Sequence, residues 1–181
     1  MHTFLPAEIL LPKTASMEKW AVIACDQFTS DPAYWQRVRE RTQDAPSAMR
    51  LILPEAELGT PMEEVSTQRI NQTMLDYLAE GVFESYPDCF VYVERTLLSG
   101  AVRKGLIGKV DLEAYDYAPG SVSAVRATEK TVVERIPPRR RVRQNAPLEF
   151  PHILMLCDDD QKELLEPIAA GKDKLPPPYA F

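Results

Sequence analysis

Residues 62–80, MEEVSTQRINQTMLDYLAE, carry the clearest helical pattern in the chain. The apolar residues Ile70, Met74, Tyr77 and Leu78 recur at spacings of three and four, which places them on one face of an α-helix. Gly81 follows directly and is a natural helix stop, because glycine adopts the left-handed conformation at a helix end at little cost. The pattern therefore predicts a long helix that packs through one apolar face.

Shorter apolar runs and turn signals lie on both sides of this helix. Residues 4–11 read as a strand or an extended arm, Ser99-Gly100 separates two runs in the manner of a β-hairpin, and Asp31-Pro32 is a typical helix start. We expect a mixed sheet with about four helices, an α+β fold with a loosely alternating α/β arrangement as the alternative. The expected strands lie near residues 20–25, 48–53, 89–98, 101–110 and 152–157, and the other helices near 32–41, 138–145 and 161–170.

Length and composition are those of a soluble globular protein. The 181 residues are enough for one domain, which we place at residues 1–170, followed by an extended or disordered tail at 171–181. The three cysteines are scattered and match no zinc spacing, so neither a disulfide framework nor a structural metal is indicated. No signal peptide and no run of 18 apolar residues is present. We therefore expect a cytoplasmic protein with no membrane partner.

The charge of the chain is unevenly distributed. The net charge of −6 argues against nucleic-acid binding, which requires a broadly basic surface. Residues 126–143, RATEKTVVERIPPRRRVR, nevertheless hold seven of the 21 Lys and Arg against two Glu, a local charge of +5. A helix starting at Pro138 would place Arg139 and Arg143 on one face, where each guanidinium can hold a phosphate or carboxylate bidentately. Arg126, Thr128 and Arg135 join this predicted ligand site if the fold brings them near.

A second interpretation of the basic segment is structural. The chain has 27 acidic residues, so the arginines can instead pair with carboxylates of the same chain or of another subunit, including a second copy in a homo-oligomer. The sequence predicts a small anionic ligand only slightly better than this scaffold role.

Candidates for catalysis and metal binding are few and generic. Asp26 lies where a predicted strand meets a helix start, Glu129 lies in the basic segment, and His152 precedes a predicted strand. Asp158 and Asp159 follow that strand and could hold Mg²⁺ together with a phosphate ligand, although capping of the next helix is the favoured explanation. Neither of the common glycine-rich phosphate loops occurs, so any phosphate site belongs to another class.

Several segments, in their order along the chain, resemble the bacterial domain-of-unknown-function 1015 family. They are FLPAEILLP at 4–12, EKWAVIACDQFTSDPAYW at 18–35, LILPEAEL at 51–58, YPDCFVYVERTL at 86–97, GLIGKVDLEAYDYAPGSVSAVRATEKTVVERIPPR at 105–139 and NAPLEFPH at 145–152.

The resemblance implies no settled biochemical role. Members of the family are longer, and their later part carries an Asp-Gly-Asn-His or Asp-Gly-His-His segment that is similar in type to one in ParB/sulfiredoxin-like phosphotransferases, including free-serine kinases. No Asp-Gly pair occurs here, so the resemblance implies that this chain corresponds to the N-terminal part of such a protein.

Overall fold

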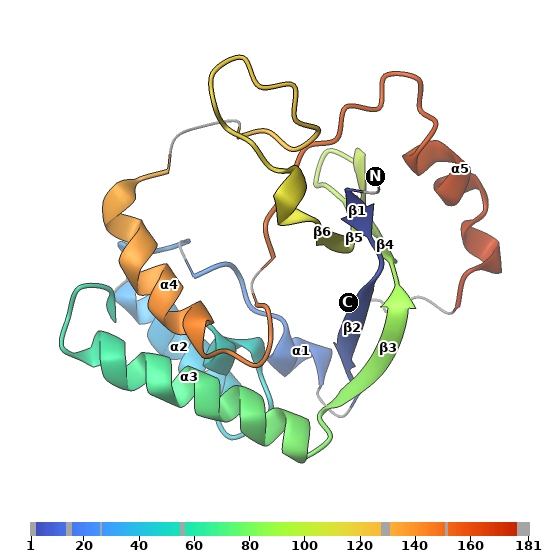
Figure 1. Cartoon of the computed structure of the whole chain (residues 1–181). Helices are drawn as coiled ribbons and strands as arrows, with labels where there is room; N and C mark the ends of the chain where they lie inside the picture. The colour runs from blue at the N-terminus through green and yellow to red at the C-terminus, as the bar shows by residue number, and fades with distance from the viewer. Residues whose placement is uncertain are drawn as a thin grey trace. The chain divides into compact units, whose positions relative to one another are not determined.

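The computed structural model describes residues 3–13, 16–25, 27–54, 57–127, 131–150 and 152–176 (Figure 1). It has the predicted α+β class, with helices and short strand pairs. Contacts divide the chain into two compact units. The strand unit comprises Met1–Leu10, Ser85–Lys130 and Leu154–Ala180, and the helical unit comprises Leu11–Glu84 and Thr131–Ile153.

The helical unit is built on α3 (Met62–Ala79), the helix that the periodic pattern predicts. Gly81 has a φ of 68° just beyond its end, as expected of a glycine stop. The other helices of this unit are α1 (Met17–Trp20), α2 (Pro32–Thr42), the 3₁₀ helices η1 (Ala48–Leu51) and η4 (Val133–Arg135), and α4 (Ile136–Gln144). The start of α2 is also confirmed, since the Asp31 carboxylate accepts the Tyr34 N–H at 3.0 Å.

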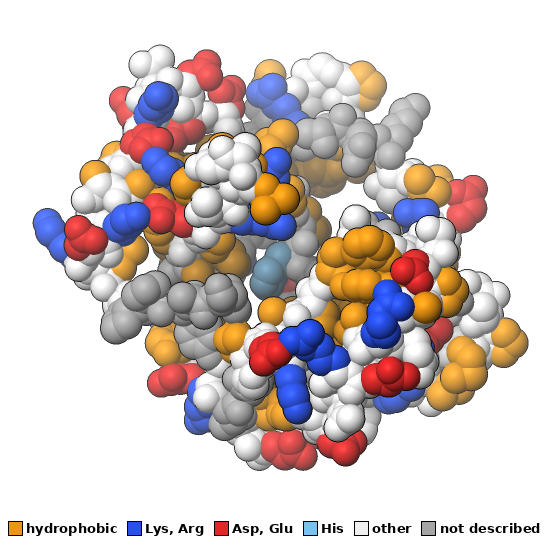
Figure 2. Space-filling model, turned by 180° about the vertical axis from the view of Figure 1, so that it is seen from behind, with side chains coloured by type: hydrophobic (Ala, Val, Ile, Leu, Met, Phe, Trp, Pro, Cys, Tyr) orange, Lys and Arg blue, Asp and Glu red, His pale blue; other side chains and the backbone are white. Residues whose placement is uncertain are grey.

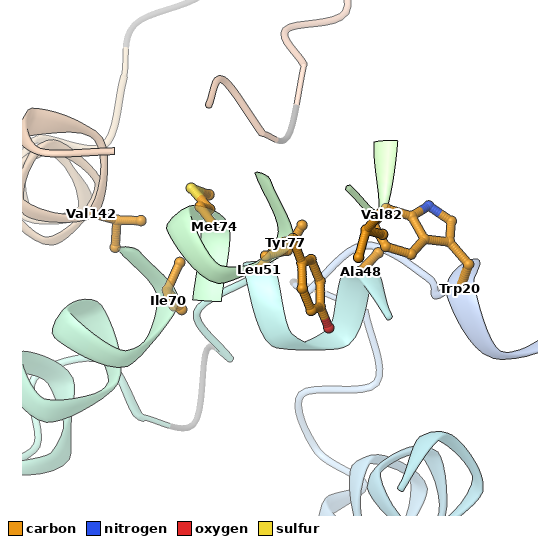
Figure 3. Packing of buried hydrophobic residues seen from close by; sticks show 8 residues of the cluster. All are labelled: Trp20, Ala48, Leu51, Ile70, Met74, Tyr77, Val82 and Val142. Carbon is orange, nitrogen blue, oxygen red and sulfur yellow. The ribbon is translucent and has the colours of Figure 1, made fainter. Parts of the chain in front are cut away.

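The core of the helical unit lies where α3 meets η1, α4 and the end of α1 (Figure 3). Trp20 packs at the edge of this cluster, with its ring centroid 6.1 Å from that of Tyr77 and 5.6 Å from that of Phe83. The apolar face of α3 thus meets partners that are distant in sequence. The buried members of the cluster are Trp20, Ala48, Leu51, Ile70, Met74, Tyr77, Val82 and Val142.

The Tyr77 hydroxyl fixes the start of η1 inside this core. It accepts the N–H of Ser47 at 3.0 Å, and burial raises the pKa of Tyr77. Tyr77→Phe should lower the free energy of unfolding by about 1–2 kcal/mol, because the buried Ser47 N–H loses its partner. Urea denaturation followed by tryptophan fluorescence measures this change, and an unchanged midpoint would mean that the bond contributes nothing.

The strand unit contains short antiparallel pairs. Strand β1 (Phe4–Leu5) pairs with β6 (Lys109–Val110), and β4 (Val91–Thr96) pairs with β5 (Val102–Ile107). The second pair confirms the predicted hairpin, and Gly100 in its turn has a φ of 82°. Strand β2 (Ala7–Pro12) pairs with β3 (Phe83–Cys89). Instead of one mixed sheet, the described strands form three two-stranded pairs.

Helices in this unit are short, and its described residues form no buried cluster comparable to that of the helical unit. They are the 3₁₀ helices η3 (Leu112–Ala114) and η5 (Lys172–Lys174), and α5 (Leu165–Ala170). Helix η5 occupies part of the predicted tail, and α5 begins four residues later than the 161–170 expectation.

Three of the predicted strands are wrong. Residues 21–25 are irregular after α1, and residues 48–51 form η1, started by the Ser47 hydroxyl, which accepts the Met49 N–H at 3.2 Å. Residues 48–51 pack against α3 instead of pairing as a strand, whereas residues 21–25 are buried only in part, at Val22 and Cys25. Apolarity alone cannot distinguish these outcomes from a strand. Residues 152–157 are irregular as well, and Leu154 and Leu156 are 87% and 86% exposed.

Within the described ranges, no helix has both the length and the apolar character that crossing a bilayer would require. The placement of one domain at residues 1–170 stays a prediction.

Candidate functional site

The arginines of the basic segment form a stripe along α4. Helix α4 begins at Ile136, two residues earlier than predicted, and η4 leads directly into it. Arg135, Arg139 and Arg143 are therefore separated by four residues each in continuous helical backbone, which places their side chains on one side of the helix. We call these three residues the arginine stripe. The sequence predicted the alignment of Arg139 with Arg143 but left the position of Arg135 open.

The arginine stripe is exposed and only partly committed to ion pairs. Arg143 Nη2 lies 2.9 Å from Glu149 Oε1, and both side chains are well exposed. Arg139 has no ion pair within the part of the chain that the structure describes. The central member of the stripe can therefore bind an anion without first breaking a contact to the described residues.

The start of α4 offers few backbone donors for an anion. Pro137 and Pro138 have no N–H, and the Ile136 N–H already donates to the Val133 carbonyl. A helix N-terminus usually binds anions through its free amides, and here most of these are absent or used. Any anion near this helix must accordingly be held by guanidinium groups.

On the opposite side of α4, an ion pair connects this helix to α3. The sequence did not indicate this pair. Arg141 Nε donates to Glu63 Oε1 at 2.8 Å, and its Nη2 contacts the same oxygen. Glu63 is only 6% exposed and also accepts the Gly59 N–H at 2.8 Å. The Gly59 hydrogen bond and the Arg141 guanidinium lower the pKa of Glu63. The spacing of 78 residues between the partners leaves no local signal from which this pair could be predicted.

A second carboxylate connects α2 and α3 in the same unit. Glu57 lies with Oε1 3.1 Å from Arg39 Nη2, and its Oε2 accepts the Ser66 hydroxyl. On the face drawn in Figure 2, basic and acidic side chains of the described residues are interspersed. The ion pairs of Glu63 with Arg141 and of Glu57 with Arg39 show that arginines of the helical unit have a structural role.

The remaining predicted site residues lie either in described segments other than α4 or outside the described residues. Arg126 belongs to the strand unit, where its Nε donates to the Ser123 carbonyl at 2.9 Å. Asp26, Thr128 and Glu129 lie outside the described residues. His152 is exposed, and its ring centroid lies 6.5 Å from that of Phe150.

The acidic run after residue 157 stabilises a loop through hydrogen bonds to backbone N–H groups. The Asp159 carboxylate accepts the N–H groups of Glu163 at 2.9 Å and of Leu164 and Leu165 at 3.2 Å. Desolvation raises the pKa of Asp159, but these three N–H groups outweigh it, so the pKa lies below its usual value. Asp158 makes no comparable set of side-chain contacts to the residues that the structure describes. Among the described residues, no group of three or more His, Cys, Asp or Glu is placed to hold a metal ion.

An open depression of about 450 Å³ lies beside this loop in the strand unit. Lys104 and Glu166, which form an ion pair with 2.5 Å between Nζ and Oε2, lie on its wall together with Cys157, Lys162 and the acidic run. The mixture of charges selects for no single class of ligand.

A family model described as "Protein of unknown function (DUF1015)" matches residues 5–181. The chain belongs to the DUF1015 family. The match covers both units, so the resemblance seen in the sequence segments is confirmed. Neither a curated protein nor a solved structure matches this DUF1015 chain. The family description names no activity, so the function must be inferred from the side chains themselves.

Proposed function

We propose that this DUF1015 chain binds a phosphate-bearing ligand through its arginine stripe. The observation that carries the proposal is the four-residue spacing of Arg135, Arg139 and Arg143 on one side of α4. Each guanidinium presents a planar set of donors that matches two phosphate oxygens. Successive members of the stripe lie about 6 Å apart along the helix, a spacing suited to neighbouring phosphates of a nucleotide or to one phosphate between two arginines.

The state of the three arginines supports this proposal. Arg139 is exposed and unpaired within the described residues, and Arg143 holds Glu149 in an exposed ion pair that contributes about 0–1 kcal/mol. An incoming phosphate with two negative charges can replace that carboxylate at small cost.

The proposal extends to a phosphotransferase-like enzyme of which this chain is one part. Phosphoryl transfer depends on positioning and charge neutralisation, and arginines supply both. A base and the ligands of Mg²⁺ would come from Asp26 or Glu129, with His152, Asp158 and Asp159 as further candidates. The Asp159 carboxylate is already engaged by three backbone N–H groups, which makes it the weakest of these candidates.

Ligand-dependent thermal stability tests the arginine stripe. The chain is heated with inorganic phosphate, ATP, GTP or phosphoserine, with and without Mg²⁺, at constant ionic strength. A ligand at a hundredfold excess over its Kd should stabilise the folded state by about 2.7 kcal/mol. Arg139→Ala should reduce the increase in Tm, because it removes the central guanidinium of the stripe.

Arg140→Ala is the matched control. Arg140 is the next residue, is equally exposed, and projects from a different side of α4. It should leave the increase in Tm intact. Equal losses in the two variants would mean that only the net charge matters, and no increase with any ligand would contradict the proposal.

The alternative function is a non-catalytic scaffold in which the arginines make structural ion pairs. The Arg141–Glu63 and Arg143–Glu149 pairs favour it. In that case Arg143→Ala should lower Tm without ligand, or weaken self-association in sedimentation experiments, and phosphate ligands should have no effect. A monomer at high protein concentration would count against the form of this alternative that involves a second copy.

A further inference from the structure

The β4–β5 hairpin places two arginines directly opposite each other. Arg95 pairs with Arg103 in the register of the antiparallel strands. Directly opposed residues project from the same face, with Cβ atoms about 5 Å apart. Like charges at this distance repel, so the pair destabilises the hairpin unless an anion lies between the two guanidinium groups.

The nearest acidic residue of the hairpin is engaged on the other face. Glu94 precedes Arg95 in β4 and therefore projects to the opposite side. There its carboxylate accepts Lys172 Nζ at 3.0 Å and the Tyr92 hydroxyl at 2.8 Å, and the Lys172 ammonium lowers the pKa of Glu94. This carboxylate cannot neutralise Arg95 without giving up both contacts.

No other described carboxylate takes its place. Within residues 3–10, 85–127 and 154–176, which make up the described part of the strand unit, neither Arg95 nor Arg103 forms an ion pair, and both are exposed. The hairpin thus carries two adjacent unneutralised positive charges on one face.

The same face is open beside the two arginines. Gly105 lies opposite Val93, two residues from Arg103, and no atom lies within 4 Å of the point where a Cβ would be. A ligand can therefore approach the backbone at this point. A phosphate monoester dianion carries up to two negative charges and three terminal oxygens, so it can neutralise both arginines and engage both guanidinium groups, whereas a carboxylate carries a single charge.

We propose that Arg95 and Arg103 bind the dianion of a phosphate monoester on this face of the β4–β5 hairpin. The site belongs to the strand unit and shares no residue with the arginine stripe of α4. This proposal can therefore be tested separately from the proposed function.

Titration of the whole ¹⁵N-labelled chain with inorganic phosphate and then phenyl phosphate, at constant ionic strength, tests the site. The amide signals of Arg95, Arg103 and Gly105 should shift and saturate. Arg103→Gln should raise the apparent Kd for these shifts about tenfold or more, because one charge-assisted contact is lost. Arg37→Gln, an exposed arginine of the helical unit, should change nothing, and Arg139→Ala should affect only the α4 signals. Shifts that do not saturate, or that persist in Arg103→Gln, would overturn the proposal.

A stability measurement gives an independent readout. Arg103→Glu puts an acid opposite Arg95, so in phosphate-free buffer of low ionic strength its thermal midpoint should equal or exceed that of the wild type. In the Arg139→Ala background, which removes the contribution of the arginine stripe, phosphate should raise the midpoint, and adding Arg103→Glu should abolish that increase. A lower midpoint for Arg103→Glu without phosphate would mean that the arginines already have partners, and would overturn the proposal.

Discussion

Replacing Met74 by Ala should lower the free energy of unfolding of the helical unit by about 3 kcal/mol, within the range of about 2–5 kcal/mol for such truncations in a core. Met74 is fully buried, at 0% exposure, in the middle of the apolar face of α3. The substitution removes its transfer free energy and leaves a cavity between α3 and its neighbours. The thermal midpoint should decrease by roughly 10 °C, as expected for a chain of this length.

Tryptophan fluorescence during urea denaturation is suited to this measurement. Both tryptophans of the chain, Trp20 and Trp35, are buried in the helical unit, so their emission reports the unfolding of that unit. Leu78→Ala is the matched control, since Leu78 lies one turn further along the same helix and is 41% exposed. It should cost less than about 1 kcal/mol. Equal losses of unfolding free energy in Met74→Ala and Leu78→Ala would contradict the placement of the core on the Met74 side of α3.

Replacing Glu63 by Gln should cost about 2 kcal/mol at neutral pH. The glutamine retains the shape of the side chain, but the Arg141 guanidinium and the Gly59 N–H lose a charged acceptor in a buried position. Glu64→Gln, on the exposed side of the same helical turn, is the control and should stay within about 0.5 kcal/mol of the wild type.

The difference between the wild type and Glu63→Gln should depend on pH. The pKa of Glu63 in the folded protein lies below its ordinary value of 4.5, so on acidification the unfolded chain takes up this proton before the folded chain does. The contribution of Glu63 is therefore fully present above pH 4.5 and decreases as the pH falls towards the folded pKa. Denaturation midpoints between neutral pH and pH 3 measure this, and a difference that stays constant would contradict the role of the charge.

The sequence by itself determined the elements whose signals are local. The apolar periodicity of residues 62–80, the Asp31-Pro32 start and the Ser99-Gly100 turn each depend on near neighbours in the chain, and each element formed as predicted. The alignment of Arg139 with Arg143 belongs to the same class, because helical geometry relates residues four apart.

Tertiary structure decided the rest. The runs at residues 20–25, 48–53 and 152–157 are apolar, but only the surroundings determine whether such a run pairs as a strand, packs irregularly against a helix or stays exposed. The Arg141–Glu63 pair and the Arg95–Arg103 register join residues through packing and strand pairing. Contacts of this kind produce no periodic pattern in the sequence, because they depend on which distant segments the fold brings together and not on neighbouring residues.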